Sequence, residues 1–157
     1  MSKSGTSGIP PEIGEGKRGE DGYLGYLLRQ AAAAYRLRLD RALADLGITP
    51  PQFAVMTMLK AYPGQSNADI ARLALLTPQT TSVIVANLER ARHIERRPHK
   101  VHGRILQIDL TPAGEKLLKA CRSRVHLMEE ELAQILGNDD VKALRRWLIA
   151  VARLNSI

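Results

Sequence analysis

The sequence predicts a mainly α-helical protein with one small β-hairpin. Apolar residues recur every three or four positions over long stretches at both ends of the chain, which is the spacing of one helix face. Thr-Pro pairs mark three helix starts, and one segment near residue 106 alternates apolar and polar side chains as a half-buried strand does. These observations favour several helices with a single hairpin among them.

Length and composition favour one domain without catalytic machinery. The chain has 157 residues and a single cysteine, Cys121, so no internal disulfide can form and we expect a reducing cytoplasm. No apolar run approaches the roughly 20 residues that span a bilayer, and no signal peptide pattern is found. No nucleophile motif, phosphate-binding glycine loop or catalytic pair of carboxylates stands out either. We therefore expect no enzyme, no cofactor and no membrane partner.

The positive charge is concentrated in the middle of the chain. The formal net charge is +7, and residues 47–111 carry 8 Lys and Arg against 4 Asp and Glu. A basic excess of this kind suits a polyanion, because each contact of Lys or Arg with a phosphate releases condensed counterions. On charge alone, a solvated surface explains the excess equally well.

The chain opens with a segment that is unlike the rest. Residues 1–21 are rich in Gly, Ser, Pro, Lys and Glu, so we expect a flexible, disordered arm or a cloning remnant. From residue 22 an apolar stripe predicts a helix over residues 22–46, which Gly47 ends. The stripe consists of Leu24, Leu28, Ala31, Tyr35, Leu39, Ala42 and Leu46.

Capping signals predict where the later helices begin. A threonine can accept hydrogen bonds from free N–H groups of the first turn, and the proline after it has no N–H to leave unpaired. The pairs are Thr49-Pro50, Thr77-Pro78 and Thr111-Pro112. Gln52 completes a capping box in the first, and another helix begins at Ser66 with Asp69 placed similarly.

A hairpin is predicted between the Thr77 helix and Thr111. Residues 104–110 alternate, with Leu106, Ile108 and Leu110 apolar, and residues 94–97 supply a partner strand across a basic turn at residues 98–103. Two long helices follow, separated by Gly137. The apolar stripe of the first of these includes Cys121, where a thiol is usually a small buried hydrophobe rather than a redox sensor.

Helix, short connection, helix and hairpin is the order of a winged helix-turn-helix, in which the second helix enters the major groove of DNA. The residues of the two helices that are expected to point into the lobe are Ile70, Ala71, Ala74, Thr81, Ile84, Val85 and Leu88. The opposite face suits base edges and phosphates, and it consists of Thr77, Gln79, Thr80, Ser82, Val83 and Asn87. For any one of the polar residues near the helix start, simple capping is the alternative.

The hairpin carries a dense group of cations. Six basic residues lie within positions 90–104, beside a single acid, Glu95. We interpret the hairpin as a wing along the DNA backbone, with Arg97, Lys100 and Arg104 in contact with phosphate or the minor groove. Arg96 has the alternative role of tying the base of the wing to an acidic group of the same domain.

Residues 70–114 resemble the signature of the MarR family of transcriptional regulators. They read IARLALLTPQTTSVIVANLERARHIERRPHKVHGRILQIDLTPAG. In the family, a recognition helix ends in Leu-Glu-Lys/Arg, continues into a short hydrophobic-Glu-Arg strand and returns by a basic wing to Leu-Thr-x-x-Gly. The resemblance implies a single domain over residues 22–157, with a winged helix-turn-helix lobe at 49–111 and dimerisation helices at 22–46 and 112–155. It also implies a homodimer on a pseudo-palindromic duplex, usually a repressor, often released by a small aromatic effector.

Three departures from the family pattern concern the lobe and its wing. Arg92 and His93 stand where the family often has Gly before the first strand, and Leu75 replaces a common Gly in the turn between the two helices. His102 stands where many members have an Asp that braces the wing arginine, which is matched by Arg104. Either another acid orients Arg104 or the wing is looser.

An effector pocket between the dimerisation helices and the lobe is expected at Tyr26, Tyr35, Phe53 and Met56, although each could equally be plain core. His93, His99, His102 and His126 invite a metal hypothesis, but no Cys or acid lies at ligand spacing, so we expect no metal. The rival function is a protein-interaction dimer whose degenerate winged helix does not read DNA. Steep loss of duplex binding with rising salt would separate the two functions.

Overall fold

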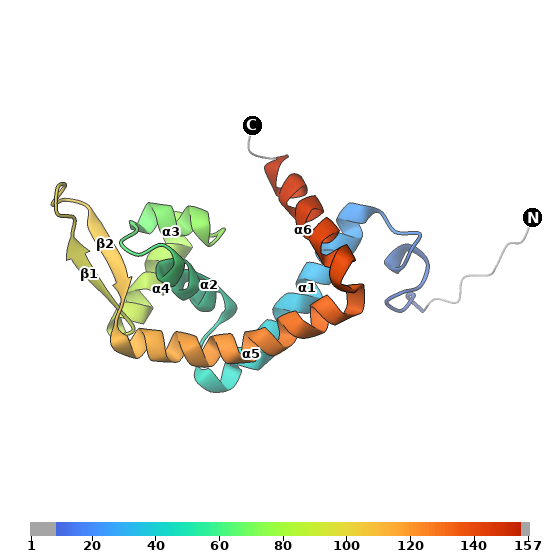
Figure 1. Cartoon of the computed structure of the whole chain (residues 1–157), viewed down its shortest axis with the longest axis horizontal. Coiled ribbons are helices and arrows are strands. Elements are labelled where there is room, and N and C mark those ends of the chain that lie inside the picture. Colours follow the sequence, from blue (N-terminus) through green and yellow to red (C-terminus); the bar gives the residue numbers. More distant parts are fainter. Residues whose placement is uncertain (1–8, 155–157) are drawn as a thin grey trace, which may run out of the picture. The chain divides into compact units, whose positions relative to one another are not determined.

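The computed structural model describes residues 9–154 and divides the chain at Arg41 into two units, which are described separately here. The first unit contains a 3-10 helix, Gly16–Arg18, and most of helix α1, Leu24–Leu43 (Figure 1). Two hydrogen bonds join Gln30 of α1 to Arg18. Nε of Arg18 donates to the side-chain oxygen of Gln30 at 3.3 Å, and the side-chain NH2 of Gln30 donates to the Arg18 carbonyl at 3.1 Å. The part of the predicted disordered arm at residues 9–21 thus includes a helical turn bonded to α1, while residues 1–8 lie outside the described residues.

The second unit contains the remaining elements in the predicted order. They are a 3-10 helix at Ala44–Leu46, α2 at Pro50–Ala61, α3 at Asn67–Leu73, α4 at Pro78–Arg90, β1 at Ile94–Pro98, β2 at Leu106–Leu110, α5 at Pro112–Leu136 and α6 at Asn138–Arg153. The helix expected over residues 22–46 therefore ends at Leu43, and Gly47 with a φ of 67° closes the extra turn. The second strand begins two residues later than predicted.

All four predicted caps are formed. The side chains of Thr49, Ser66, Thr77 and Thr111 each accept a hydrogen bond from a backbone N–H in the first turn of the helix that follows. Thr49 and Gln52 form the reciprocal capping box, at 3.4 and 2.9 Å. Each cap stabilises its helix by about 1 kcal/mol, which fixes where these helices begin.

The core of the second unit lies where α2, α3 and α4 meet the hairpin. Val55, Met56 and Leu59 of α2 are fully or almost fully buried. Six of the seven predicted inward residues of α3 and α4 are buried, and only Ala74, at the end of α3, is half-buried. Thr81 is completely buried and donates its hydroxyl to the Thr77 carbonyl at 2.9 Å, so burial leaves no unpaired hydroxyl there.

The hairpin is antiparallel, with Ile94 opposite Leu110 and Pro98 opposite Leu106. A third segment joins it, because the N–H of Ile108 donates to the carbonyl of Gln65 at 3.0 Å in an isolated bridge. This bridge attaches the loop between α2 and α3 to β2, and the sequence pattern did not predict it.

Helix α5 begins directly at the base of the hairpin (Figure 1). Thr111 donates its N–H to the His93 carbonyl at 3.0 Å and its hydroxyl to the Arg92 carbonyl at 2.7 Å. Gly114 is buried against the same backbone, since a Cβ there would lie 1.9 Å from the His93 carbonyl oxygen. A side chain at this position of the Leu-Thr-x-x-Gly sequence would therefore force the backbone of α5 and His93 apart.

Two ion pairs connect α5 to earlier elements of the second unit. Lys60 Nζ of α2 lies 2.7 Å from Glu115, and Arg124 Nη2 lies 2.7 Å from Asp45. The Arg124 hydrogen bond lowers the pKa of Asp45 below its ordinary value of 3.8. In the part of the chain that the structure describes, no helix is long and apolar enough to cross a membrane.

Candidate nucleic-acid interface

Helix α4 exposes the face that the sequence analysis assigned to DNA. Thr77, Gln79, Thr80, Ser82, Val83 and Asn87 are all exposed, whereas the opposite face of the helix is buried in the lobe. Among the described residues, no side chain or backbone group is bonded to the Gln79 amide. Val83 is 61% exposed, and an apolar side chain in that position can contact a thymine methyl group.

Some of these side chains already have partners within the protein. Thr77 accepts from the N–H of Thr80 and donates to its hydroxyl at 2.9 Å, so Thr77 caps α4, and its contact with DNA stays a prediction. Ser82 donates to the Pro78 carbonyl at 2.9 Å and accepts from Asn67 of α3 at 3.2 Å. The Asn87 side-chain oxygen accepts from Arg90 at 3.2 Å. Gln79 and Val83 are therefore the side chains of this face best placed to meet base edges.

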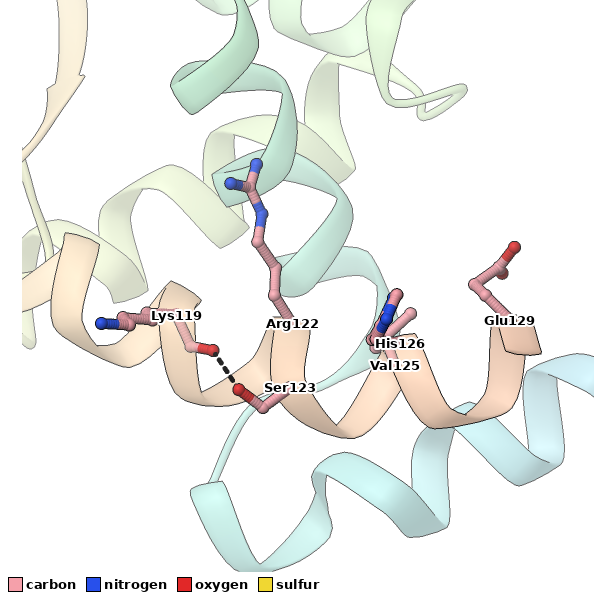
Figure 2. A pocket seen from close by; sticks show the side chains of 6 residues that line it. All are labelled: Lys119, Arg122, Ser123, Val125, His126 and Glu129. Atoms are coloured by element: carbon pink, nitrogen blue, oxygen red, sulfur yellow. Dashed lines mark hydrogen bonds between the residues drawn. The ribbon is translucent and has the colours of Figure 1, made fainter. Parts of the chain in front are cut away.

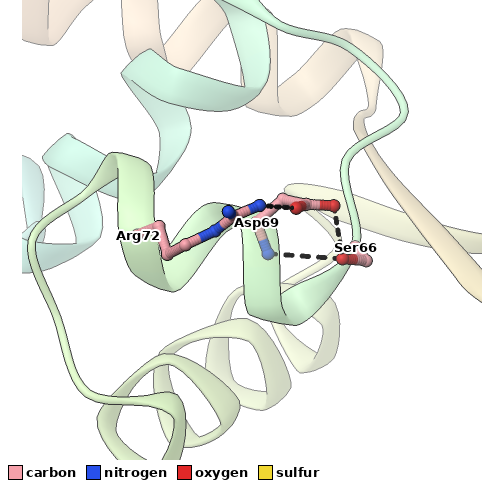
Figure 3. A network of polar contacts seen from close by, with 3 residues as sticks. All are labelled: Ser66, Asp69 and Arg72. Carbon is pink, nitrogen blue, oxygen red and sulfur yellow. Dashed lines mark hydrogen bonds and ion pairs between the residues drawn. The ribbon is translucent and has the colours of Figure 1, made fainter.

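The first helix of the motif has its own polar network, shown in Figure 3. Ser66 Oγ accepts from the N–H of Asp69 at 3.3 Å and donates to Asp69 Oδ2 at 2.6 Å. Arg72 Nη2 donates to Asp69 Oδ1 at 2.5 Å. The Ser66 hydroxyl and then Arg72 lower the pKa of Asp69 below 3.8. The network fixes the start of α3 and occupies Arg72.

The two arginines at the middle of β1 pair with different acids. Arg96 lies 3.1 Å from Glu89 of α4, which confirms the alternative role considered for Arg96. Arg97 lies 2.5 Å from Asp109 of β2. Contact of Arg97 with phosphate therefore stays a prediction, and the ion pair with Asp109 competes with such a contact.

The wing tip presents the remaining cations. Lys100 and Arg104 are exposed, and neither pairs with a carboxylate among the described residues. Nδ1 of His99 accepts from the N–H groups of Val101 and His102, both at 3.1 Å, and thereby fixes the turn. In the part of the chain that the structure describes, no carboxylate braces Arg104 in place of the Asp that the resemblance led us to expect at His102. Lys100 and Arg104 therefore extend from a turn held by a histidine. No group of three or more potential metal ligands occurs among the side chains that the structure describes.

Two non-glycine residues of the lobe have left-handed backbone conformations. Leu75, in the turn between α3 and α4, has a φ of 57°, and Arg92, before β1, has a φ of 62°. Both stand at positions where the sequence analysis noted that glycine is common in the family. At these two positions the backbone has the conformation that glycine favours, and the Cβ atoms of Leu75 and Arg92 make it strained.

The four residues expected to form an effector pocket have different surroundings. Tyr26 is 40% exposed and lines a cavity of the first unit of about 620 Å³, and Tyr35 is half-buried. In the second unit, Phe53 is half-buried and Met56 is completely buried, which favours the core role for Met56. A pocket shared by the four residues stays a prediction.

Helix α5 carries a groove of about 470 Å³ that the sequence pattern did not predict. All of its lining residues come from this helix, as Figure 2 shows, and they are Lys119, Arg122, Ser123, Val125, His126 and Glu129. Among the described residues, neither Lys119 nor Arg122 pairs with a carboxylate, whereas His126 lies 3.2 Å from Glu130. Cys121, on the buried face of the same helix, is completely buried, which confirms its expected place on the packed face, and burial raises the pKa of its thiol.

An exposed polar helix face, braced by a second helix and followed by a cationic hairpin, defines a winged helix-turn-helix protein of the DNA-binding class. Residues 46–105 match the MarR family. The transcriptional repressor Rv2887 of Mycobacterium tuberculosis is 33% identical over 129 residues, which are 82% of this chain and 93% of the relative. The chain belongs to the MarR family of transcriptional regulators.

Two solved structures extend the comparison. The transcriptional repressor CouR, bound to a 23-mer DNA duplex, matches with a TM-score of 0.77 and 27% identity, over 83% of this chain and 93% of CouR. Rv2887 of M. tuberculosis in complex with salicylic acid matches with a TM-score of 0.67 and 32% identity, over 84% of this chain and 98% of that one. These matches confirm the predicted mainly α-helical fold with its β-hairpin wing.

Proposed function

We propose that this protein is a repressor that binds a pseudo-palindromic DNA duplex as a homodimer and leaves it when a small aromatic acid binds. The observation that carries the proposal is the exposed face of α4, with the unpaired Gln79 amide and Val83, beside a wing that ends in Lys100 and Arg104. Gln79 and Val83 suit base edges, whereas Lys100 and Arg104 suit phosphate or the minor groove. Action on chromosomal DNA together with a single unpaired cysteine would place the protein in the cytoplasm.

The homodimer part of the proposal is supported by the apolar surface of α5 and α6. A groove of about 280 Å³ between these helices is lined mostly by apolar side chains, and Trp147 is 38% exposed nearby on α6. Exposed apolar side chains that gather around one groove are typical of protein interfaces. A two-fold dimer would present two α4 helices about one DNA turn, or roughly 34 Å, apart.

The effector part of the proposal is supported by the groove on α5. Its unpaired Lys119 and Arg122 can bind a carboxylate, and the stems of these side chains with Val125 offer apolar contact to an aromatic ring. The related Rv2887 has been solved with salicylic acid, which has both features. An effector of this chemistry would shift the population away from the DNA-binding state if it binds the other state more tightly.

The experiment that tests the function is selection of bound fragments from the source genome, followed by salt titration of the selected and of random duplexes. We expect Arg104→Ala to weaken binding to both duplexes and to reduce the salt slope by about 0.9, the share of one phosphate contact. We expect Gln79→Ala to change which sequences are preferred while the salt slope stays the same. Salicylate added to the operator complex is expected to release the DNA.

Equal effects of the two substitutions on operator and random DNA would contradict this division of roles. A protein that binds no duplex even at low salt would instead support the rival function, a protein-interaction dimer with a degenerate winged helix. The cations at the wing tip favour the DNA-binding function over that rival, because unpaired charge at a hairpin tip serves a phosphate backbone directly.

A further inference from the structure

The Asp109 carboxylate joins three segments at the base of the wing. Its Oδ1 accepts a hydrogen bond from the backbone N–H of Gly64, at 2.8 Å, in the loop between α2 and α3. Its Oδ2 accepts from Nε of Arg97 on β1, at 2.5 Å. The Asp109 side chain is only 16% exposed, whereas that of Arg97 is 53% exposed. One carboxylate on β2 thus holds both a loop of the lobe and a cation of the wing.

The loop side of this junction is fixed by the backbone. Ile108, next to Asp109, donates its N–H to the Gln65 carbonyl at 3.0 Å, so β2 and the loop are held together independently of the carboxylate. Gly64 has a φ of +76°, and a Cβ at this position would lie 3.3 Å from the Gln107 side chain. The exposed Arg97 guanidinium is therefore the partner of Asp109 that is able to turn elsewhere.

We propose that Asp109 limits the positive charge that the wing offers to DNA, by pairing with Arg97 and withholding it from the phosphates. The inference rests on the proposed DNA-binding function, and it adds Asp109 as a residue that acts on DNA binding through Arg97. Arg97 has the exposure and the place on β1 to reach a phosphate, and its pairing with Asp109 is what neutralises its charge. Contacts to phosphate strengthen binding to every sequence alike, so Asp109 sets the level of non-specific binding.

The size of the effect follows from counterion release. One phosphate contact adds about 0.9 to the salt slope of binding, which corresponds to about fivefold in affinity at 0.15 M salt relative to 1 M. Freeing Arg97 is expected to tighten binding to random DNA by that factor. A purely structural role for Asp109 would give the opposite sign, because a loosened wing weakens binding.

The test measures the binding of random duplex DNA over a range of salt concentrations for the full-length protein and three variants. Asp109→Asn keeps an oxygen for the Gly64 N–H and removes the charge, so we expect about fivefold tighter binding at 0.15 M salt and a slope steeper by about 0.9. Arg97→Ala alone is expected to leave affinity and slope within twofold of the wild type. The double variant Arg97→Ala/Asp109→Asn is expected to lose the gain, which isolates the interaction between the two residues.

Lys100→Ala is the control for an unpaired wing cation, with an expected loss of about 0.9 in slope. The proposal is overturned if Arg97→Ala reduces the slope as Lys100→Ala does, because Arg97 would then already contact phosphate. It is also overturned if Asp109→Asn, with a melting temperature near that of the wild type, binds no tighter. Should Asp109→Asn fail to fold, the result for Arg97→Ala decides alone. Failure of the wild type to bind any duplex would contradict the proposed function instead.

Discussion

Gly114→Ala is expected to weaken the junction between the wing and α5. A Cβ at this position would lie 1.9 Å from the His93 carbonyl oxygen and 2.8 Å from its carbonyl carbon. Both atoms belong to the backbone, so no side chain can rotate to make room, and the start of α5 must move away from β1. The movement breaks the two hydrogen bonds that Thr111 donates to this backbone, at 3.0 and 2.7 Å.

The expected cost can be assembled from these losses. Two hydrogen bonds contribute about 1 kcal/mol each, and residual overpacking costs about 1 to 3 kcal/mol. Alanine regains up to about 1 kcal/mol because it favours the helix more than glycine does. The net loss is about 2 to 4 kcal/mol, which lowers the melting temperature of a chain of this size by about 4 to 16 °C.

The assay is thermal and urea unfolding at one fixed protein concentration, because dimerisation makes stability depend on concentration. Gly25→Ala is the matched control, since Gly25 also lies in the first turn of a helix and a Cβ there meets no atom within 4 Å. We expect this control to melt at or slightly above the wild-type temperature. If Gly114→Ala melts within 2 °C of Gly25→Ala, the close approach to His93 does not explain the glycine.

Two further predictions concern the helix-turn-helix. Leu75→Gly should raise the free energy of unfolding by up to about 1 kcal/mol. The left-handed backbone of Leu75 costs about 1 to 2 kcal/mol, which glycine removes, and the larger entropy that glycine loses on folding offsets part of this gain. Leu75 is 91% exposed and loses little packing, so a lower urea midpoint would contradict this reasoning. Asp69→Asn should lower stability at pH 7 but not at strongly acidic pH. The folded pKa of Asp69 lies below its ordinary value of 3.8, so its contribution is present above pH 3.8 and is lost as the pH falls through the folded pKa. A stability difference between wild type and Asp69→Asn that does not change with pH would show that the charge of Asp69 is not responsible.

The local features of this fold could be predicted from the sequence because their causes are local. A threonine before a proline caps a helix through its own side chain, and Thr49, Thr77 and Thr111 do so wherever the rest of the chain lies. The apolar stripes likewise determined which faces of α3 and α4 are buried. Even the departures from the family pattern were informative, since Leu75 and Arg92 are the two non-glycine residues with positive φ among those described.

The features that the sequence did not predict depend on approaches between distant segments. The bridge between Gln65 and Ile108 joins residues more than forty positions apart, and neither residue carries a local signal for it. The groove on α5 arises from a run of polar residues along one helix, which reads as an ordinary solvated face. Residues 9–21 lack the apolar content of a folded segment, and the bonds between Arg18 and Gln30 could not be expected from composition.

The two arginines of β1 show why counting charges overstates a DNA-binding surface. Neighbouring residues of a strand point to opposite faces, so the sequence implies that Arg96 and Arg97 have different surroundings. Which acid each one meets depends on the hairpin register and on where α4 ends, and these place Glu89 beside Arg96 and Asp109 beside Arg97. Two of the cations counted in the wing are therefore neutralised within the protein. The salt dependence of binding should reflect the unpaired cations, Lys100 and Arg104 among them, rather than the number of basic residues in the segment.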